Sequence, residues 1–249
     1  MNVRRFHHGI FALCSLFLAG CNNSPGRPRF NAEAVRPDEI KDFSRLYASN
    51  CSACHGRDGQ NGPAIALANS TYQAIVNEDR LRSVITGGDR GTLMPAFAQS
   101  AGGLLTADQV DVLVKGIRSN WYKADALKGL DVPPYKANGQ GDVARGQQVF
   151  TGDCARCHSP GAEKKDSKGG SVTDGSYLAL VNDQALRAII IAGRPDLGHP
   201  DWRGAAPDHP MSNQDVTDVV AWMASQRGKT PGQPYPSQQL PAEGEKDHE

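Results

Sequence analysis

The sequence predicts an all-α protein made of two tandem copies of one module. Three observations carry this prediction. The pattern C-x-x-C-H occurs twice, as Cys51–His55 and as Cys154–His158. The stretch Tyr72–Phe97 aligns without a gap on Tyr177–Trp202, at a constant shift of 105 residues (177 minus 72). The segments around both copies carry apolar residues at helical spacing.

The first module is predicted to hold three main helices. A helix over 37–47 leads to the first C-x-x-C-H, and a second covers 72–85 and stops at a pair of glycines. Thr106 and Gln109 form a capping box that opens the last helix. The apolar face of that helix holds Val110, Leu113, Val114 and Ile117.

The second module repeats this order. Residues 142–150 are expected to form its first helix. Its last helix is expected to run from a cap at Ser212 to about Gln226. The division of the chain that we predict is a signal peptide 1–20, a flexible tether 21–36, a first domain 37–120, a linker 121–141, a second domain 142–227 and a disordered tail 228–249.

The repeated pentapeptide has a specific chemical meaning. C-x-x-C-H is the attachment signal for c-type haem, in which both thiols reach one porphyrin edge and the histidine binds the iron as proximal ligand. A zinc or redox C-x-x-C followed by a chance histidine is the alternative, which two copies disfavour. We expect two covalent haem c groups. The predicted attachment residues are Cys51, Cys54, Cys154 and Cys157, and the predicted proximal ligands are His55 and His158.

The composition fits a protein built around a bound group. Apolar residues make up 39% and aromatic residues 6% of the 249 residues, which is little for a large side-chain core. A buried porphyrin would supply the apolar surface that a short module lacks. The formal net charge is zero, and no basic tract or interleaving of basic and aromatic residues indicates a nucleic-acid-binding protein.

The first twenty residues predict export. A cationic start precedes the apolar run 9–18, which is too short to span a bilayer as a stable helix. The run ends in LAGC at 18–21, which resembles the lipobox of bacterial lipoproteins. The resemblance implies that Cys21 is acylated and anchors the protein to a bacterial membrane, on its periplasmic or outer side. Ordinary signal cleavage with an incidental Cys21 is the alternative.

Each module resembles class I cytochrome c in the order of its parts: a first helix, C-x-x-C-H, a middle helix, a loop with the distal ligand and a last helix. The resemblance covers 37–117 and 142–226. In that family a loop methionine is the sixth iron ligand, and Met94 matches it. The family also implies that the Pro63 carbonyl accepts a hydrogen bond from the proximal imidazole. The second module has no matching proline.

The second module departs from the family at the sixth ligand. The ungapped register places His199 where Met94 stands, so we expect His199 to bind the second iron. Met211 is the main competitor, but it abuts the helix cap, whereas Met94 and His199 precede their caps by 12 and 13 residues. His209 is a more distant alternative, and Met223 lies within the last helix and is expected to be a core residue.

The family crosses its first and last helices closely, with a glycine on the first and an aromatic residue on the last. The second module follows this pattern with Gly146 and Trp222. In the first module the aligned positions hold Phe43 and Gly116, so the large and small partners are exchanged. We expect Phe43 to pack over Gly116; the alternative is that Phe43 is an ordinary residue of an apolar face.

The resemblance implies an electron carrier and not an enzyme. The predicted protein is a membrane-anchored dihaem cytochrome c that passes single electrons from a quinol-oxidising complex or periplasmic dehydrogenase to an acceptor such as a terminal oxidase. A dihaem peroxidase-like oxidoreductase with one open iron is one alternative. A haem subunit of a larger respiratory complex is the other.

Overall fold

The computed structural model describes residues 35–158, 169–204 and 209–228. The chain divides into two compact units, Met1–Glu39 and Ile40–Glu249, and the second unit contains the main helices of both modules. The predicted signal peptide, the lipobox residue Cys21, the tether up to residue 34 and the tail from residue 229 lie outside the described residues. Within the described residues, no helix is long and apolar enough to cross a membrane.

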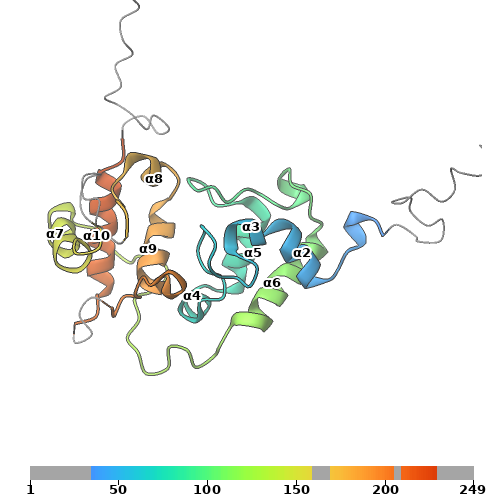
Figure 1. The fold of residues 1–249 in the computed structure, drawn as a ribbon, viewed down its shortest axis with the longest axis horizontal. Coiled ribbons are helices and arrows are strands. Elements are labelled where there is room, and N and C mark those ends of the chain that lie inside the picture. The colour runs from blue at the N-terminus through green and yellow to red at the C-terminus, as the bar shows by residue number, and fades with distance from the viewer. Residues whose placement is uncertain (1–34, 159–168, 205–208, 229–249) are drawn as a thin grey trace, which may run out of the picture. The chain divides into compact units, whose positions relative to one another are not determined.

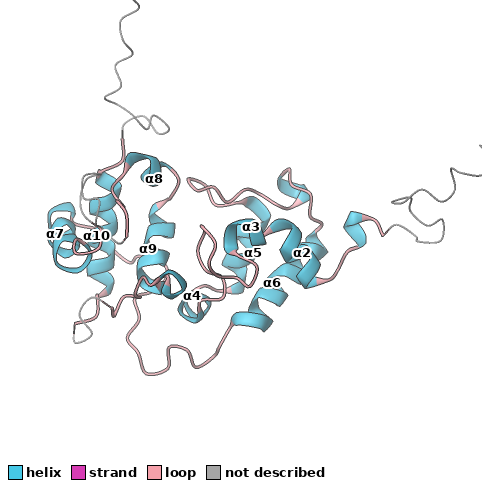
Figure 2. Ribbon diagram, viewed as in Figure 1, coloured by secondary structure: helices cyan, strands magenta, loops and turns pink. Residues whose placement is uncertain are grey.

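Helices form the regular structure of both modules (Figures 1 and 2). The first module contains η2 Pro37–Glu39, α2 Phe43–Asn50, α3 Ser52–His55, α4 Ser70–Ile75, α5 Glu78–Gly87, η3 Gln99–Ala101 and α6 Ala107–Trp121. The second contains α7 Val143–Val149, the π-helical turn η4 Phe150–Cys154, α8 Gly175–Ala179, α9 Asp183–Ala192, η5 Pro195–Leu197 and α10 Asn213–Ser225. Two isolated β-bridges are the only β structure of the described residues. The all-α prediction is confirmed.

The first helix starts later than the sequence suggested. Pro37 opens only a short 3-10 turn, and α2 begins at Phe43. The reason is a local cap, because the Asp42 carboxylate accepts the Arg45 amide at 2.8 Å. The end of α6 also differs by one residue from the predicted start of the linker, since Trp121 closes that helix and packs against Phe43 and Tyr47.

The middle helix is two helices in each module, so its prediction as one helix was wrong. Asn77 separates α4 from α5, and its side chain accepts the Arg80 amide at 2.8 Å. Asn182 does the same between α8 and α9, accepting the Ala185 amide at 2.7 Å. These two asparagines stand at matching positions of the repeat, and asparagine is among the best helix caps.

The last helices agree with the sequence. Thr106 and Gln109 form the predicted capping box, and Ser212 caps α10 in the same way with Asp215 as its partner. The predicted apolar face of α6 is buried in the first core. Its residues are at most 2% exposed: Val110, Leu113, Val114 and Ile117.

The helix crossings hold the predicted exchange of large and small partners. A Cβ atom on Gly116 would overlap the Phe43 ring, so Phe43 packs over Gly116 as expected. In the second module a Cβ atom on Gly146 would overlap the Asp218 carbonyl and lie 2.8 Å from the Trp222 Cβ. A glycine therefore leaves room for the other helix at both crossings, and the large aromatic partner is supplied from opposite helices.

Candidate functional site: two haem-binding motifs

Both C-x-x-C-H motifs form one tight helical turn. In the first, the His55 amide donates to the Cys51 carbonyl at 2.9 Å, and in the second the His158 amide donates to the Cys154 carbonyl at 2.8 Å. The turn places the two cysteines of each motif one helical turn apart and the histidine directly after them. This is the spacing that double attachment and proximal ligation require.

The cysteine environments suit uncharged sulfur. Burial, helped by the neighbouring Cys54, raises the pKa of Cys51 to about 12. Burial likewise raises the pKa of Cys154 to about 12. A thiolate is the reactive and metal-binding form of cysteine, so the raised pKa favours the uncharged form of the first cysteine of each motif. A thioether carries no charge and fits these environments.

The proximal histidine of the first module is held by one backbone carbonyl. His55 is 8% exposed, and its Nδ1 donates to the Ile65 carbonyl at 2.8 Å. The prediction that the Pro63 carbonyl accepts this bond is therefore wrong, because the acceptor lies two residues later in the chain. The bond fixes the ring orientation and leaves Nε2 for a metal.

The second module provides the same support from a different loop. His158 Nδ1 donates to the Gly170 carbonyl at 3.0 Å. Gly169 lies flat against the imidazole, and a Cβ atom there would stand 2.6 Å from Nδ1. Gly169 therefore leaves the space that the imidazole occupies.

The two distal loops have the same backbone arrangement. Gly88 and Gly193 both have positive φ, at 75° and 65°. A Cβ atom on Gly88 would meet the Pro95 carbonyl carbon and the Ala96 amide, and one on Gly193 would meet the matching atoms of Pro200 and Asp201. These contacts keep the 105-residue register through the loop, so His199 stands in the backbone position of Met94.

The imidazoles of His158 and His199 face each other across the second module. Their ring centroids are 5.6 Å apart. Two metal–imidazole bonds of about 2 Å each, plus the offset of each nitrogen from its ring centre, span roughly 6 Å. His199 Nδ1 is buried and has no hydrogen-bond partner among the described residues. The pair of rings therefore fits a metal centre with one imidazole on each side.

The competing ligands have other positions. The Met211 amide donates to the Trp202 carbonyl at 2.9 Å, as the Leu105 amide donates to the Phe97 carbonyl at 2.7 Å. Met211 thus occupies the place of a core leucine, directly before the helix cap. Met223 is 5% exposed in the core of the second module, whereas His209 is exposed.

Comparisons with known proteins agree with this geometry. A family model described as cytochrome C oxidase, cbb3-type, subunit III matches residues 38–115, and one described as cytochrome c matches 143–227. Cytochrome c6 of Diacronema lutheri is 31% identical over 88 residues, which are 35% of this chain and 100% of the relative. The chain belongs to the cytochrome c family. As a tandem cytochrome c, it carries two covalently bound haem c groups and serves in electron transfer.

Two longer relatives are similar to this cytochrome c. The cbb3-type cytochrome c oxidase subunit CcoP of Azospirillum sp. (strain B510) is 32% identical over 128 residues, 47% of this chain and 38% of the relative. The cytochrome bc1 complex cytochrome c subunit of Corynebacterium diphtheriae is 26% identical over 247 residues, 93% of this chain and 83% of the relative. The matched part is thus under half of the CcoP subunit but most of the bc1 subunit.

Burial favours the neutral form of two candidate ligands, His55 and His199. Burial lowers the pKa of His55, and the nearby Arg194 charge lowers it further. The hydrogen bond to the Ile65 carbonyl acts in the opposite direction but is smaller than the effect of burial. Burial and the neighbouring His158 lower the pKa of His199. A neutral imidazole is the form that binds a metal.

Sequence reasoning missed the groups that support these histidines. The acceptors are main-chain carbonyls of Ile65 and Gly170, and every residue has a carbonyl, so no residue type marks them. It also missed Arg194, which is buried between the two modules. The repeat did not draw attention to Arg194, because the aligned residue of the first module is Asp89 and not an arginine.

Proposed function

We propose that this chain is a membrane-anchored dihaem cytochrome c that passes single electrons between a donor and an acceptor of a respiratory chain. The haem groups would supply the electron-transfer chemistry when bound, and side chains of this chain would hold them and ligate each iron. The residues proposed for the first haem are Cys51, Cys54, His55 and Met94. Those proposed for the second are Cys154, Cys157, His158 and His199.

The facing pair of His158 and His199 carries the proposal. Thioether ligation favours ferrous iron, so a centre with Met94 has a higher potential than one with two imidazoles. Electrons would then pass downhill from the second module to the first. If both irons are ligated on both sides as proposed, no iron would be open to a substrate, and this would favour a carrier over a peroxidase-like enzyme.

Replacing His199 with methionine tests the ligand assignment. We expect His199→Met to raise the reduction potential of one haem and to leave the other unchanged in a spectroelectrochemical titration. Met211→Leu is the matched control and should leave both potentials in place. A titration of His199→Met that superimposes on the native curve would refute the assignment.

The proposed membrane anchor depends on Cys21. With acylation at this residue, most of the protein should sediment with membranes, because several acyl chains together bind a bilayer firmly. We expect Cys21→Ser to release haem-containing protein into the soluble fraction. Cys14→Ser is the control, since Cys14 lies within the predicted leader. Equal membrane retention of both variants would contradict the anchor.

The names of the relatives support a partner within a respiratory assembly, either a quinol-oxidising complex or a terminal oxidase. A periplasmic dehydrogenase is a further candidate donor. Purification in a mild detergent separates a permanent subunit from a free carrier. A subunit co-elutes with other respiratory haem proteins at constant ratio, whereas a carrier elutes alone and exchanges electrons only on mixing.

A further inference from the structure

One buried ion pair lies at the start of the segment that carries His199. The side chains of Arg194 and Asp196 are 10% and 4% exposed. Arg194 Nε lies 3.0 Å from one carboxylate oxygen of Asp196, and Nη2 lies 2.7 Å from the other. Bidentate pairing of this kind holds both side chains in one geometry. We call these two residues the 194–196 clamp.

The 194–196 clamp forms hydrogen bonds with the backbone of two adjacent residues in the first module. Arg194 Nη2 donates to the Gly62 carbonyl at 2.7 Å, and Asp196 Oδ2 accepts the Asn61 amide at 2.8 Å. Asn61 has a φ of 62°, a left-handed conformation that asparagine tolerates well. A donor and an acceptor of the clamp therefore match an acceptor and a donor of this turn.

The loop that contains Asn61 and Gly62 also packs against the first haem motif. A Cβ atom on Gly62 would overlap the Cys54 carbonyl and stand 2.8 Å from the His55 carbonyl carbon, so Gly62 lies directly against the motif. Three residues later, the Ile65 carbonyl accepts the bond from the His55 imidazole. The loop thus orients the candidate ligand of the first module.

On its other side, the clamp is joined to His199. The Arg194 amide donates to the His199 carbonyl at 3.0 Å, and the His199 amide donates to the Arg194 carbonyl at 2.9 Å. Arg194 is therefore bonded through its backbone to the candidate distal ligand of the second module. Through its side chain it is bonded to the loop around the first module's motif.

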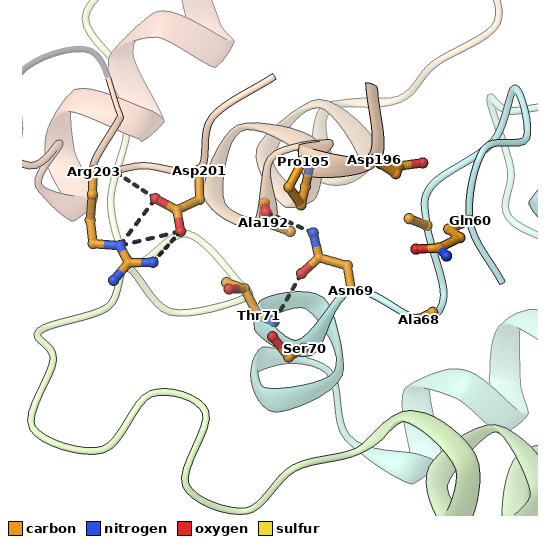
Figure 3. Close-up of a pocket in the computed structure, with 11 residues that line it drawn as sticks. Gln60, Ala68, Asn69, Ser70, Thr71, Ala192, Pro195, Asp196, Asp201 and Arg203 are labelled. Carbon is orange, nitrogen blue, oxygen red and sulfur yellow. Dashed lines mark hydrogen bonds and ion pairs between the residues drawn. The ribbon is translucent and has the colours of Figure 1, made fainter. Parts of the chain in front are cut away.

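A second buried contact crosses the same boundary. Asn69 Nδ2 donates to the Ala192 carbonyl at 2.8 Å, while its Oδ1 accepts the Thr71 amide at 2.8 Å (Figure 3). Both ends of this amide are used, as is usual for a buried polar group. The junction between the modules therefore includes buried, specifically paired polar groups beside apolar contacts such as that of Ala192 with the first core.

We propose that Arg194 and Asp196 are positioning residues for electron transfer between the two modules. The proposal rests on the proposed function, because it takes His55 and His199 as iron ligands. The rate of electron transfer falls steeply as the donor and the acceptor move apart. A side-chain pair that fixes the distance between two ligand-bearing loops therefore affects this rate. With haem bound, one electron would pass from the iron that His158 and His199 would hold to the iron that His55 and Met94 would hold, so that the first would be oxidised and the second reduced. No bond forms or breaks.

A matched control lies nearby in the sequence. Asp201 and Arg203 form a second ion pair with the same two-residue spacing, and Arg203 Nε lies 3.1 Å from Asp201 Oδ1 (Figure 3). Within the described residues, no hydrogen bond joins the side chains of this pair to the first module. R203Q therefore removes an ion pair of the same spacing, more exposed than the clamp at 47% and 17%, whose side chains make no hydrogen bond to the described part of the first module.

The experiment measures transfer between modules in the full dihaem protein after pulse-radiolytic reduction. We expect R194Q to slow it severalfold, because loss of the clamp lets the two ligand-bearing loops move apart. D196N should slow it in the same direction, and R203Q should keep the native rate. Both reduction potentials and the low-spin spectra should stay native, so that the driving force is equal in all proteins.

Native rates in R194Q and D196N would overturn the proposal. If R194Q fails to mature with two haems, the milder D196N decides the question alone. Failure of the proposed function would look different, because the native protein itself would show a high-spin iron or no transfer between modules. A purely structural role of the clamp would lower thermal stability and leave the transfer rate unchanged.

Discussion

At the residue scale, Asp218 is the most completely buried carboxylate that the structure describes, with a side chain that is 0% exposed. It accepts the Asp142 amide at 2.8 Å and Gln214 Nε2 at 2.7 Å, and it pairs with Arg145. Burial alone would raise the pKa of Asp218, but these bonds outweigh it and lower the pKa below the usual range. The carboxylate thus ties α10 to the start of α7.

The lowered pKa predicts a loss of stability in acid. An unfolded aspartate titrates near about 3.9, so the contribution of Asp218 is complete above that pH and disappears as the pH falls through the lower folded value. We expect Asp218→Asn to lower the free energy of unfolding at pH 7 by about 2 kcal/mol. It should also flatten the decline of stability below about pH 4, measured by urea unfolding across pH.

Asp108 provides the control for this prediction. Its side chain is 80% exposed and pairs with Lys41 at 3.1 Å. Exposed pairs contribute little, so Asp108→Asn should change the free energy of unfolding by less than about 0.5 kcal/mol. Equal effects of the two substitutions would show that burial of Asp218 does not matter.

Single residues of the candidate site were predictable where side-chain chemistry marks them. The pentapeptides point to the proposed attachment residues, and the repeat register favours His199 over Met211; both assignments stay predictions. The hydrogen-bond acceptors of His55 and His158 were not predictable, because the loop conformation chooses between carbonyls. The Pro63 expectation failed for this reason, since the loop turns so that Ile65 faces the ring.

At the element scale, the two helix crossings differ in what opposes the glycine. Gly116 faces the side chain of Phe43, which can rotate, whereas Gly146 faces the backbone of Asp218, which cannot move without shifting α10. Gly87 offers a comparison, because a Cβ atom there would meet nothing within 4 Å.

We expect Gly146→Ala to destabilise the protein more than Gly116→Ala. Overpacking a close contact costs about 1–3 kcal/mol, and the backbone contact should lie at the upper end. Phe43→Leu should recover part of the loss in Gly116→Ala, which a double-mutant cycle measures. Gly87→Ala should be neutral or slightly stabilising. A larger loss for Gly116→Ala than for Gly146→Ala would contradict the description of the crossings.

Helix ends were predictable where the cap has a strong signature, as at Thr106 and Ser212. The break of the middle helix was missed, although Asn77 and Asn182 match in the repeat. Helical spacing of apolar residues continues across the break, and that periodicity masked the cap. The first helix was misjudged similarly, because Pro37 is a frequent helix opener but Asp42 makes the actual cap.

At the scale of the whole molecule, Arg187 ties the linker to the second module. It is 3% exposed, and its guanidinium donates to the Pro134 carbonyl at 2.8 Å and to Asn213 Oδ1 at 2.6 Å. The next linker residue, Tyr135, packs against the first core, and its hydroxyl accepts Arg80 Nε at 3.2 Å. The linker therefore contacts both modules within two residues.

Breaking this tie should uncouple the modules. We expect Arg187→Gln to lower the free energy of unfolding by about 3 kcal/mol, because it removes the charged hydrogen bonds from a buried guanidinium to the Pro134 and Tyr135 carbonyls. It should also separate one unfolding transition into two, followed by the Soret band and by far-ultraviolet circular dichroism. Burial lowers the pKa of Arg187, which is consistent with its low exposure.

Arg82 is the repeat partner of Arg187 and gives the control. It pairs with Asp111 on the surface, with the two side chains 38% and 46% exposed. Arg82→Gln should cost less than about 1 kcal/mol and keep a single transition. A single transition in Arg187→Gln as well would mean that the linker contact does not couple the modules.

The sequence repeat predicted two modules and their order, but not how they are joined. The joining residues include Asn69, Gln184 and Arg187, whose side chains donate to backbone carbonyls more than 40 residues away. Such partners leave no pattern in a single sequence. The repeat even conceals them, since Arg82 and Arg187 align but make different contacts.

Low-temperature electron paramagnetic resonance of the oxidised protein tests the central claim most directly. Two closed iron centres, one bound by His55 and Met94 and one by His158 and His199, predict two low-spin ferric signals of equal weight. One should be typical of histidine–methionine ligation and the other of two histidines. A high-spin signal, or two signals both typical of histidine–methionine ligation, would contradict it.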